Sequence, residues 1–212
     1  MKFFGDEELI EESISKFFTK AQFTSTYKIL LFKSILKWIE NENISMTKIL
    51  NLDFISRYFI DVSWKFYKFN LKQLTTISKE VETYKIFNEK VPKEILTLTK
   101  THVEKLLPEF RRILLKDVIY RFRNDTLLYD FCIIDENNNI SINPKVPDLI
   151  DEEDFKEIRP NVSHLVFYDT TYYYLKKNQT ILNKALNFLL ISFLEKINLK
   201  IKLQLSEIID KI

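Results

Sequence analysis

The stretch ILNKALNFLLISFLEKI, residues 181–197, is the clearest structural signal in the sequence. Its apolar residues recur every three or four positions, which is the period of one face of an α-helix. The stripe consists of Leu182, Ala185, Leu186, Leu189, Leu190, Phe193, Leu194 and Ile197. We therefore predict an amphipathic helix here that packs on a core through one face.

The same period predicts helices along most of the chain. The expected helical segments are residues 10–21, 27–39, 53–69, 71–87, 92–107 and 182–197, with further helix after Pro160 and over 201–212. Residues 44–50 are expected to form a short helical turn or connector. We predict a mainly α fold, a multi-helix domain with about eight helices.

The middle of the chain changes period. Residues 118–122 and 127–134 are rich in aromatic and β-branched side chains, which favour strands. A polar turn over residues 135–139 and the short apolar segment 140–142 follow them. This pattern predicts one small β-hairpin near residues 127–142.

A connector containing Pro144, Pro147 and an acidic run follows this hairpin. We expect residues 1–212 to form a single helical domain with one candidate internal boundary, at 144–160. That boundary would separate residues 1–143, which end in the hairpin, from the C-terminal helices in residues 160–212. The stripe in residues 201–212 is expected to pack on the domain, on a partner or on following sequence.

The composition excludes several classes of site. With 212 residues, 46% of them hydrophobic, the chain can bury a substantial core. Its single glycine, Gly5, excludes a Walker loop and a dinucleotide-binding fingerprint, because both need several glycines close to phosphate. Its single cysteine, Cys132, excludes an internal disulfide and a thiolate zinc cluster, and we expect it to be a packed core thiol.

No set of residues has the spacing of a catalytic or metal site. His102 and His164 each lack a second histidine or cysteine at ligand spacing, so we expect ordinary surface or core residues. The acidic run at 148–157 lacks the glycine of a calcium loop and is interpreted as a solvated loop. We therefore expect no catalytic residue, no bound metal and no cofactor in this chain.

Signals for secretion and membrane insertion are also missing from the sequence. A signal peptide begins with basic residues that are followed by an apolar block, whereas the first residues here are acidic. The most apolar stretch, residues 188–194, is broken by Ser192 and is far shorter than the run of about 18 that suggests a membrane span. We expect a cytoplasmic protein without a membrane partner.

The charge pattern gives the first candidate for binding. The net charge is only +2, yet four arginines lie within residues 111–123 of a chain that uses lysine far more than arginine. Arginine grips phosphate and guanine edges through paired hydrogen bonds. The candidate nucleic-acid-binding residues in this cluster are Arg111, Arg112, Lys116, Arg121 and Arg123. The alternative is that they pair with the acidic connector downstream.

Two weaker candidates lie elsewhere. Arg57 and Lys65 fall on one predicted helix and extend the basic set, although core packing with solvated lysines is an alternative account. Three tyrosines at residues 172–174, followed by two lysines, are compatible with base stacking or with a helix that packs into the core.

Four segments resemble the region that precedes the nuclease module in bacterial HNH endonuclease-domain proteins. They are TSTYKILLFKSIL at 24–36, FISRYF at 54–59 with Trp64-Lys65, VIYRFR at 118–123 with LYDF at 128–131, and FLEKIN at 193–198. The resemblance spans nearly the whole chain, through short and degenerate motifs.

That resemblance implies a front domain of a restriction or antiphage-defence nuclease that engages DNA and is inert alone. The family's HNH module, with paired cysteines and an Asp-His metal site, does not occur before Ile212. The resemblance thus implies a truncated form, a split subunit or a stand-alone relative, and assigns target engagement to Arg121 and Arg123.

An alternative from another class is a protein-interaction subunit of a multi-component bacterial complex. Its C-terminal helices would dock a protein partner or a nuclease module. Convergence of the arginines on one face favours the first function, whereas a dominant uncharged apolar groove favours the second.

Overall fold

The protein is described by a computed structural model. The described residues are 6–20, 23, 25–41, 48–73, 81–134, 139–142 and 150–198. Within them the chain forms eight α-helices and one small sheet, which confirms the predicted mainly α fold. No helix among these residues has the length and apolar character needed to cross a lipid bilayer.

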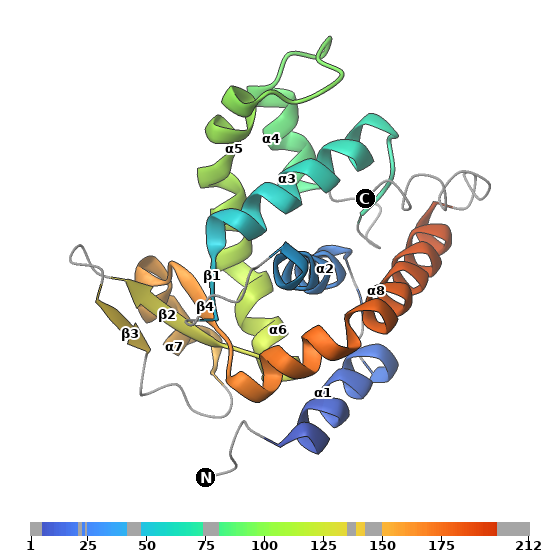
Figure 1. Ribbon diagram of the computed structural model, residues 1–212. Helices are drawn as coiled ribbons and strands as arrows, with labels where there is room; N and C mark the ends of the chain where they lie inside the picture. Colours follow the sequence, from blue (N-terminus) through green and yellow to red (C-terminus); the bar gives the residue numbers. More distant parts are fainter. Residues whose placement is uncertain are drawn as a thin grey trace.

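The helices surround one central helix, α2. Their bounds are α1 Glu7–Lys20, α2 Tyr27–Asn41, α3 Leu52–Lys68, α4 Glu82–Lys90, α5 Lys100–Ile113, α6 Ile119–Thr126, α7 Glu152–Ile158 and α8 Asp169–Ile197. A π-helical turn, η1 (Leu114–Val118), joins α5 to α6, and a 3-10 turn, η2 (Arg159–Asn161), follows α7. In Figure 1, α3 to α5 form the upper part, α8 and α1 lie below α2, and the sheet lies to one side.

Four short antiparallel strands form the sheet, in the order β1-β4-β2-β3. The strands are β1 Ile49–Asn51, β2 Asp130–Ile134, β3 Ile140–Ile142 and β4 His164–Val166. β2 and β3 are the predicted hairpin, with Cys132 opposite Ile142. The sheet is larger than predicted, because β4 pairs with β2 on one side and with β1 on the other.

Aromatic packing fills the core around α2. Phe17 of α1 lies edge-to-face with Phe32 of α2 and Phe122 of α6, with ring centroids 5.4 and 5.3 Å apart. All three are buried, and burial of such a side chain contributes about 1.5–3 kcal/mol. Ten consecutive or near-consecutive residues of α2 are buried, so this helix is enclosed on nearly all sides.

The apolar stripe of α8 faces the core. Leu182, Leu186, Leu190 and Leu194 of α8 are all buried against the rest of the molecule. Asn198, just past the end of α8, donates to the Lys72 carbonyl and accepts from the Lys72 amide, which ties the helix end to the segment after α3.

Several local expectations were wrong. Residues 118–122 are helical rather than extended, and Ile49–Asn51 is a strand rather than a helical turn or connector. The helix expected from Pro92 begins only at Lys100, and strand β4 precedes α8 after Pro160. The expected helix at 201–212 and part of the one at 71–87 lie outside the described residues.

Strands from both sides of residues 144–160 share the sheet, since β4 inserts between β1 and β2. One continuous cluster of buried side chains also extends from α1 to α8. Residues before and after the acidic stretch therefore contribute to the same core.

Candidate nucleic-acid interface

The arginine-rich segment lies on one continuous helical run formed by α5, η1 and α6. Thr99 caps its start, because the Thr99 side chain accepts a hydrogen bond from the His102 amide and the His102 ring accepts one from the Thr99 amide. The π turn at η1 accommodates one extra residue, a feature often found at functional sites. Arg111 and Arg112 precede this turn, and Lys116 lies within it.

A hollow of about 790 Å³ opens beside this helical run, and we call it the α5 groove. It is lined by Asp53, Glu104, Leu107, Pro108, Arg111, Arg112, Leu115, Lys116, Arg159 and Pro160. Four of these side chains are cationic and two are anionic, so the lining carries a net charge of +2. The groove therefore combines positive charge with an apolar surface made by leucine and proline.

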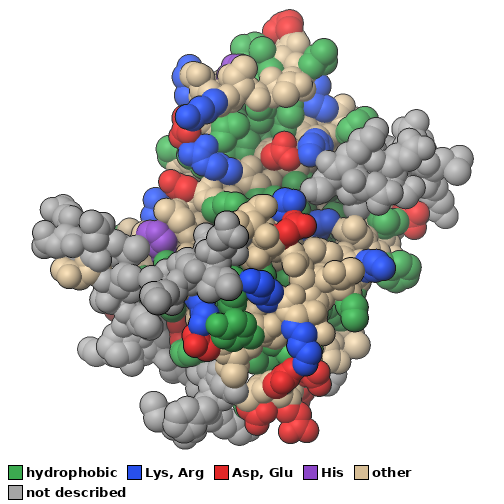
Figure 2. Space-filling model, in the orientation of Figure 1, with side chains coloured by type: hydrophobic (Ala, Val, Ile, Leu, Met, Phe, Trp, Pro, Cys, Tyr) green, Lys and Arg blue, Asp and Glu red, His purple; other side chains and the backbone are tan. Residues whose placement is uncertain are grey.

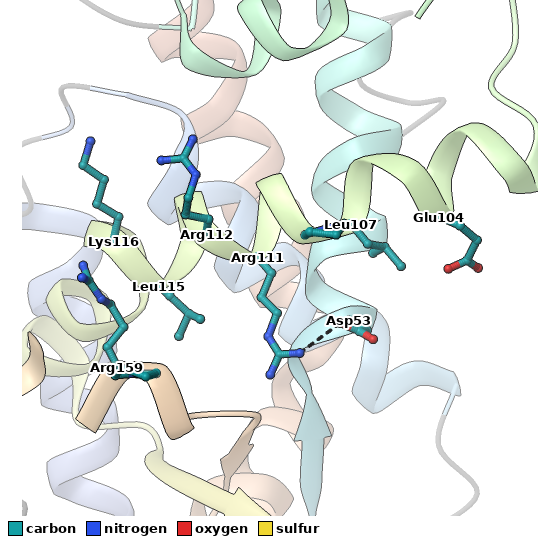
Figure 3. Close-up of a pocket in the computed structure, with 10 residues that line it drawn as sticks. Asp53, Glu104, Leu107, Arg111, Arg112, Leu115, Lys116 and Arg159 are labelled. Carbon is teal, nitrogen blue, oxygen red and sulfur yellow. Dashed lines mark ion pairs between the residues drawn. The ribbon is translucent and has the colours of Figure 1, made fainter. Parts of the chain in front are cut away.

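Arg111 forms the side of the groove that faces the sheet. Its guanidinium donates to the Val162 carbonyl at 3.3 Å and lies 3.8 Å from the Asp53 carboxylate. Figure 3 shows Arg111 reaching toward Asp53, at the start of α3. These contacts leave Arg111 about one-third exposed, with part of its donor set facing the groove.

Arg112 is held by carboxylates from two helices. It lies 2.8 Å from Glu82 of α4 and 3.3 Å from Glu109 of its own helix. The hydrogen bond with Glu82 is the main reason that the pKa of Arg112 is raised further. Hydrogen bonds from Lys90 and then Arg112 hold the pKa of Glu109 below its usual value. These ion pairs thus hold the Arg112 side chain in place before any ligand binds, and the side chain remains half exposed.

Of the four cations that line the groove, Lys116 and Arg159 form no ion pair with a carboxylate among the described residues. Lys116 is exposed on η1, and Arg159 comes from η2, beyond the sheet. In Figure 3 the Arg159 side chain extends from η2 toward the helical turn that carries Lys116. Two sequence segments therefore supply cations to one groove.

Arg159 was not among the residues selected from the sequence. It is the last of the six arginines in the chain and lies 36 residues beyond Arg123, the end of the cluster. Only the return of the chain through η2 and β4 brings it beside α5. Its one sequence signal is the scarcity of arginine in a lysine-rich chain.

Arg57 and Lys65, the weaker basic candidates, lie at and beyond the edge of the groove. Arg57 of α3 pairs with Glu104, a lining residue, at 2.8 Å. Lys65, two turns later on α3, pairs with Asp61 at 2.9 Å and does not line the groove. Arg57 therefore partly neutralises the negative charge that Glu104 brings to the groove. Lys65 belongs to another part of the surface.

The two arginines singled out by the family resemblance do not enter the groove. Arg121 is exposed on α6, with its Nε 3.1 Å from the Tyr120 hydroxyl and its guanidinium over the Tyr120 ring. Arg123 is only 1% exposed and donates to one Asp130 oxygen at 2.7 and 3.0 Å. The expectation of a phosphate contact at Arg123 is therefore corrected, since this buried pair joins α6 to β2.

The tyrosines at 172–174 divide between core and surface. Tyr172 is buried and packs edge-to-face against Trp38, whereas Tyr173 is exposed. Tyr173 lies under the Lys48 ammonium, 4.8 Å from the ring centroid. The core interpretation therefore holds for Tyr172.

The two other residues considered for chemistry, Cys132 and His164, have ordinary structural contacts. Cys132 is buried in β2, and burial raises the pKa of its thiol. Burial and the nearby Arg111 lower the pKa of His164, whose ring contacts the Ser163 hydroxyl at 2.8 Å. No group of three or more His, Cys, Asp or Glu side chains with metal-binding geometry occurs among the described residues.

Charge is interleaved over the visible face of the molecule. Figure 2 shows basic and acidic side chains side by side over the upper part, and acidic side chains gathered at the lower end, where Figure 1 places α1. The α5 groove is therefore a local concentration of positive charge on a nearly neutral protein.

No family model, curated protein or solved structure matches this chain.

Proposed function

We propose that this protein engages DNA by gripping phosphate groups in the α5 groove. The observation that carries the proposal is the convergence of Arg111, Arg112, Lys116 and Arg159 on one hollow from two distant segments. Half of the arginines of the chain line this hollow. Guanidinium and ammonium groups arranged in this way bind the oxygens of phosphate through charge-assisted hydrogen bonds.

The groove divides its cations into two kinds. Arg111 and Arg112 are oriented by existing carbonyl and carboxylate contacts, so little side-chain entropy is lost when a phosphate replaces or shares those partners. Lys116 and Arg159 form no ion pair among the described residues, so a phosphate need not displace a carboxylate to reach them. Asp53 and Glu104 limit the net charge, which favours modest, salt-sensitive binding.

The resemblance to HNH-associated front domains supports a more specific proposal. In that proposal the protein is the target-engaging part of a bacterial restriction or antiphage-defence nuclease, and a separate module supplies cleavage. The cationic side chains that line the α5 groove support the target-engaging part of this proposal.

The test is a titration of the full chain against short duplex DNA at low and moderate salt. Lys116→Ala with Arg159→Ala removes two groove cations that have no ion pair to lose among the described residues. We expect binding to weaken by roughly tenfold, and the slope of log K against log salt to fall by about two.

The matched control is Lys100→Ala with Lys105→Ala. Both lysines are exposed on α5, and neither lines the groove. The control also removes two positive charges, so it separates a local grip from a general loss of charge. Equal weakening in both double variants, or no binding of the wild type at low salt, would refute the proposal.

A second candidate function is docking of a protein partner on α8. Ile181 and Phe188 are 69% and 73% exposed and lie seven residues apart, on one face of this helix. Exposed apolar residues at this spacing are typical of a helix that packs on another protein. Ile181→Ser with Phe188→Ser should abolish association with a nuclease module or partner subunit, measured by sedimentation of the mixed proteins, and leave DNA binding intact.

A further inference from the structure

A second hollow lies between α2, α3 and α8, and it shares no residue with the α5 groove. Its volume is about 240 Å³, smaller than the cavities that usually enclose drug-sized ligands. The lining residues are Lys33, Lys37, Glu40, Tyr58, Asn183 and Asn187. Every one of them carries a polar group, which is unusual for a hollow formed between packed helices.

Hydrogen-bond donors outnumber anionic acceptors in this lining. Two ammonium groups, two amide groups and one phenol face a single carboxylate. Glu40, which supplies that carboxylate, is already paired with Lys37 at 2.9 Å. The lining therefore carries a net charge of +1 and more hydrogen-bond donors than acceptors, and a ligand rich in oxygen acceptors complements it.

Lys33 is the most buried charged residue of this lining. The residue is only 7% exposed, and its ammonium donates to the side-chain oxygen of Asn187. A lysine buried to this extent is unusual, because removal of an ammonium from water is costly. A bound anion would compensate the charge further through direct contact.

Tyr58 and Asn183 add neutral donors. Burial, reinforced by the nearby Asp61 carboxylate, raises the pKa of Tyr58, so its hydroxyl keeps its proton at neutral pH. Neither the Tyr58 hydroxyl nor the Asn183 amide forms a hydrogen bond with another described residue. Both groups are free to donate to a ligand oxygen.

We infer that this hollow binds a small oxyanion, a phosphate or carboxylate group, through Lys33 and Lys37 with support from Tyr58 and the two asparagines. The site is independent of the proposed DNA contact. Its size selects a small molecule or a single terminal group of a larger one rather than a polymer backbone.

The experiment uses the Lys116→Ala, Arg159→Ala background, in which the α5 groove is weakened as an anion site. The full chain is titrated with sodium phosphate and, separately, with sodium acetate, against sodium chloride at matched ionic strength. Thermal unfolding and amide chemical shifts are recorded. We expect a saturable rise in Tm and shifts confined to α2, α3 and α8 with one or both oxyanions.

Two substitutions locate the site. Lys37→Met removes a half-exposed cation without disturbing the core, and Asn183→Leu removes a neutral donor. We expect each substitution to weaken oxyanion binding by about tenfold, because each removes one hydrogen-bond donor, charged in Lys37 and neutral in Asn183. Lys184→Met is the matched control, since Lys184 is exposed beside Asn183 and does not line the hollow.

The outcomes distinguish the ligand and test the site. Saturation with phosphate alone or acetate alone selects the anion, and saturation with both supports a general oxyanion site. No saturable response beyond that of chloride, or an unchanged response in Lys37→Met, overturns the inference. Because the background already lacks two groove cations, failure here leaves the DNA proposal unaffected.

Discussion

Arg112 and Arg123 lie on one helical run, eleven residues apart, and have opposite environments. Arg112 is 53% exposed at the rim of the α5 groove, paired with two carboxylates that water also reaches. Arg123 is 1% exposed and paired with Asp130 inside the fold. We refer to these as the groove end and the buried end of the run.

Clustering in sequence therefore does not determine whether an arginine faces solvent or the core. In an uninterrupted α-helix, residues eleven apart return to nearly the same face. The π turn at Leu114–Val118 adds one residue between them and rotates the later part by roughly 100°. Arg123 consequently turns toward β2, whereas Arg112 and Lys116 remain at the groove.

The largest expected effect is at the buried end. Arg123→Ala leaves the Asp130 carboxylate buried without its cation, and loss of one member of a buried pair typically costs about 3–5 kcal/mol. We expect a loss of this size in the free energy of unfolding, measured by urea denaturation. Arg121→Ala, two residues earlier on the same helix, is the control. A loss below about 1 kcal/mol in Arg123→Ala would show that the pair contributes little.

The next effect concerns the hydrogen bond that supports this pair. The Tyr168 hydroxyl donates to the second oxygen of Asp130, so Tyr168→Phe removes a donor from a buried carboxylate. We expect a loss of about 1 kcal/mol, less than for a fully buried charged contact because Tyr168 is more than one-third exposed. Denaturation midpoints of Tyr168→Phe and wild type at pH 7 give the value, and identical midpoints would contradict it.

The stability contributed at the buried end should change at alkaline pH, and the stability contributed at the groove end should change at acidic pH. Burial, followed by the contact with Asp130, raises the pKa of Tyr168 in the folded state above that of the unfolded chain, about 10. Its contribution is present below that pH and is lost as the pH rises further. At the groove end, Glu109 has a lowered pKa, so its contribution is present at neutral pH and is lost as the pH falls through that pKa.

Two conservative variants separate these effects. Tyr168→Phe should reduce the loss of stability above pH 10, and Glu109→Gln should reduce the loss below pH 4.5. Stability curves from pH 3 to 11, measured by thermal unfolding, provide the comparison. If either variant changes the curve at the other end of the scale instead, the assignment of that group is wrong.

The smallest effects are at exposed cations. Arg112→Gln breaks two solvent-accessible ion pairs, so we expect a loss below about 1 kcal/mol together with clearly weaker DNA binding. Arg121→Ala should change stability by less than about 0.5 kcal/mol. A stability loss at Arg112 that matches the loss at Arg123 would remove the distinction between the two ends.

Elements with a strong period were predictable from the sequence. The stripe on α8 and the hairpin at β2 and β3 are local patterns, and both are present. β1 and β4 were missed because three-residue strands are too short to display an alternating pattern. Residues 118–122 were misassigned because Ile119, Tyr120 and Phe122 are all buried, which hides the polar face of the helix.

The candidate site was predictable in part. Arg111, Arg112 and Lys116 are close in sequence and remain close in space. Arg159 could not be added, because its position depends on the return of the chain through η2 and β4. Arg123 could not be excluded from the candidate site by its sequence alone, because its burial depends on the partner Asp130. Asp130 lies on a strand that follows the left-handed residue Leu127.

The strand order also sets how the molecule can assemble during synthesis. Asn51 pairs with His164, more than one hundred residues later, so β1 has no partner until β4 has left the ribosome. Closing so long a loop is costly and slow compared with forming a local helix. The helices around α2 can therefore form early, whereas the sheet, and with it the position of Arg159 beside α5, is completed last. A nascent chain thus acquires its complete α5 groove only after β4, which ends at Val166, has been translated.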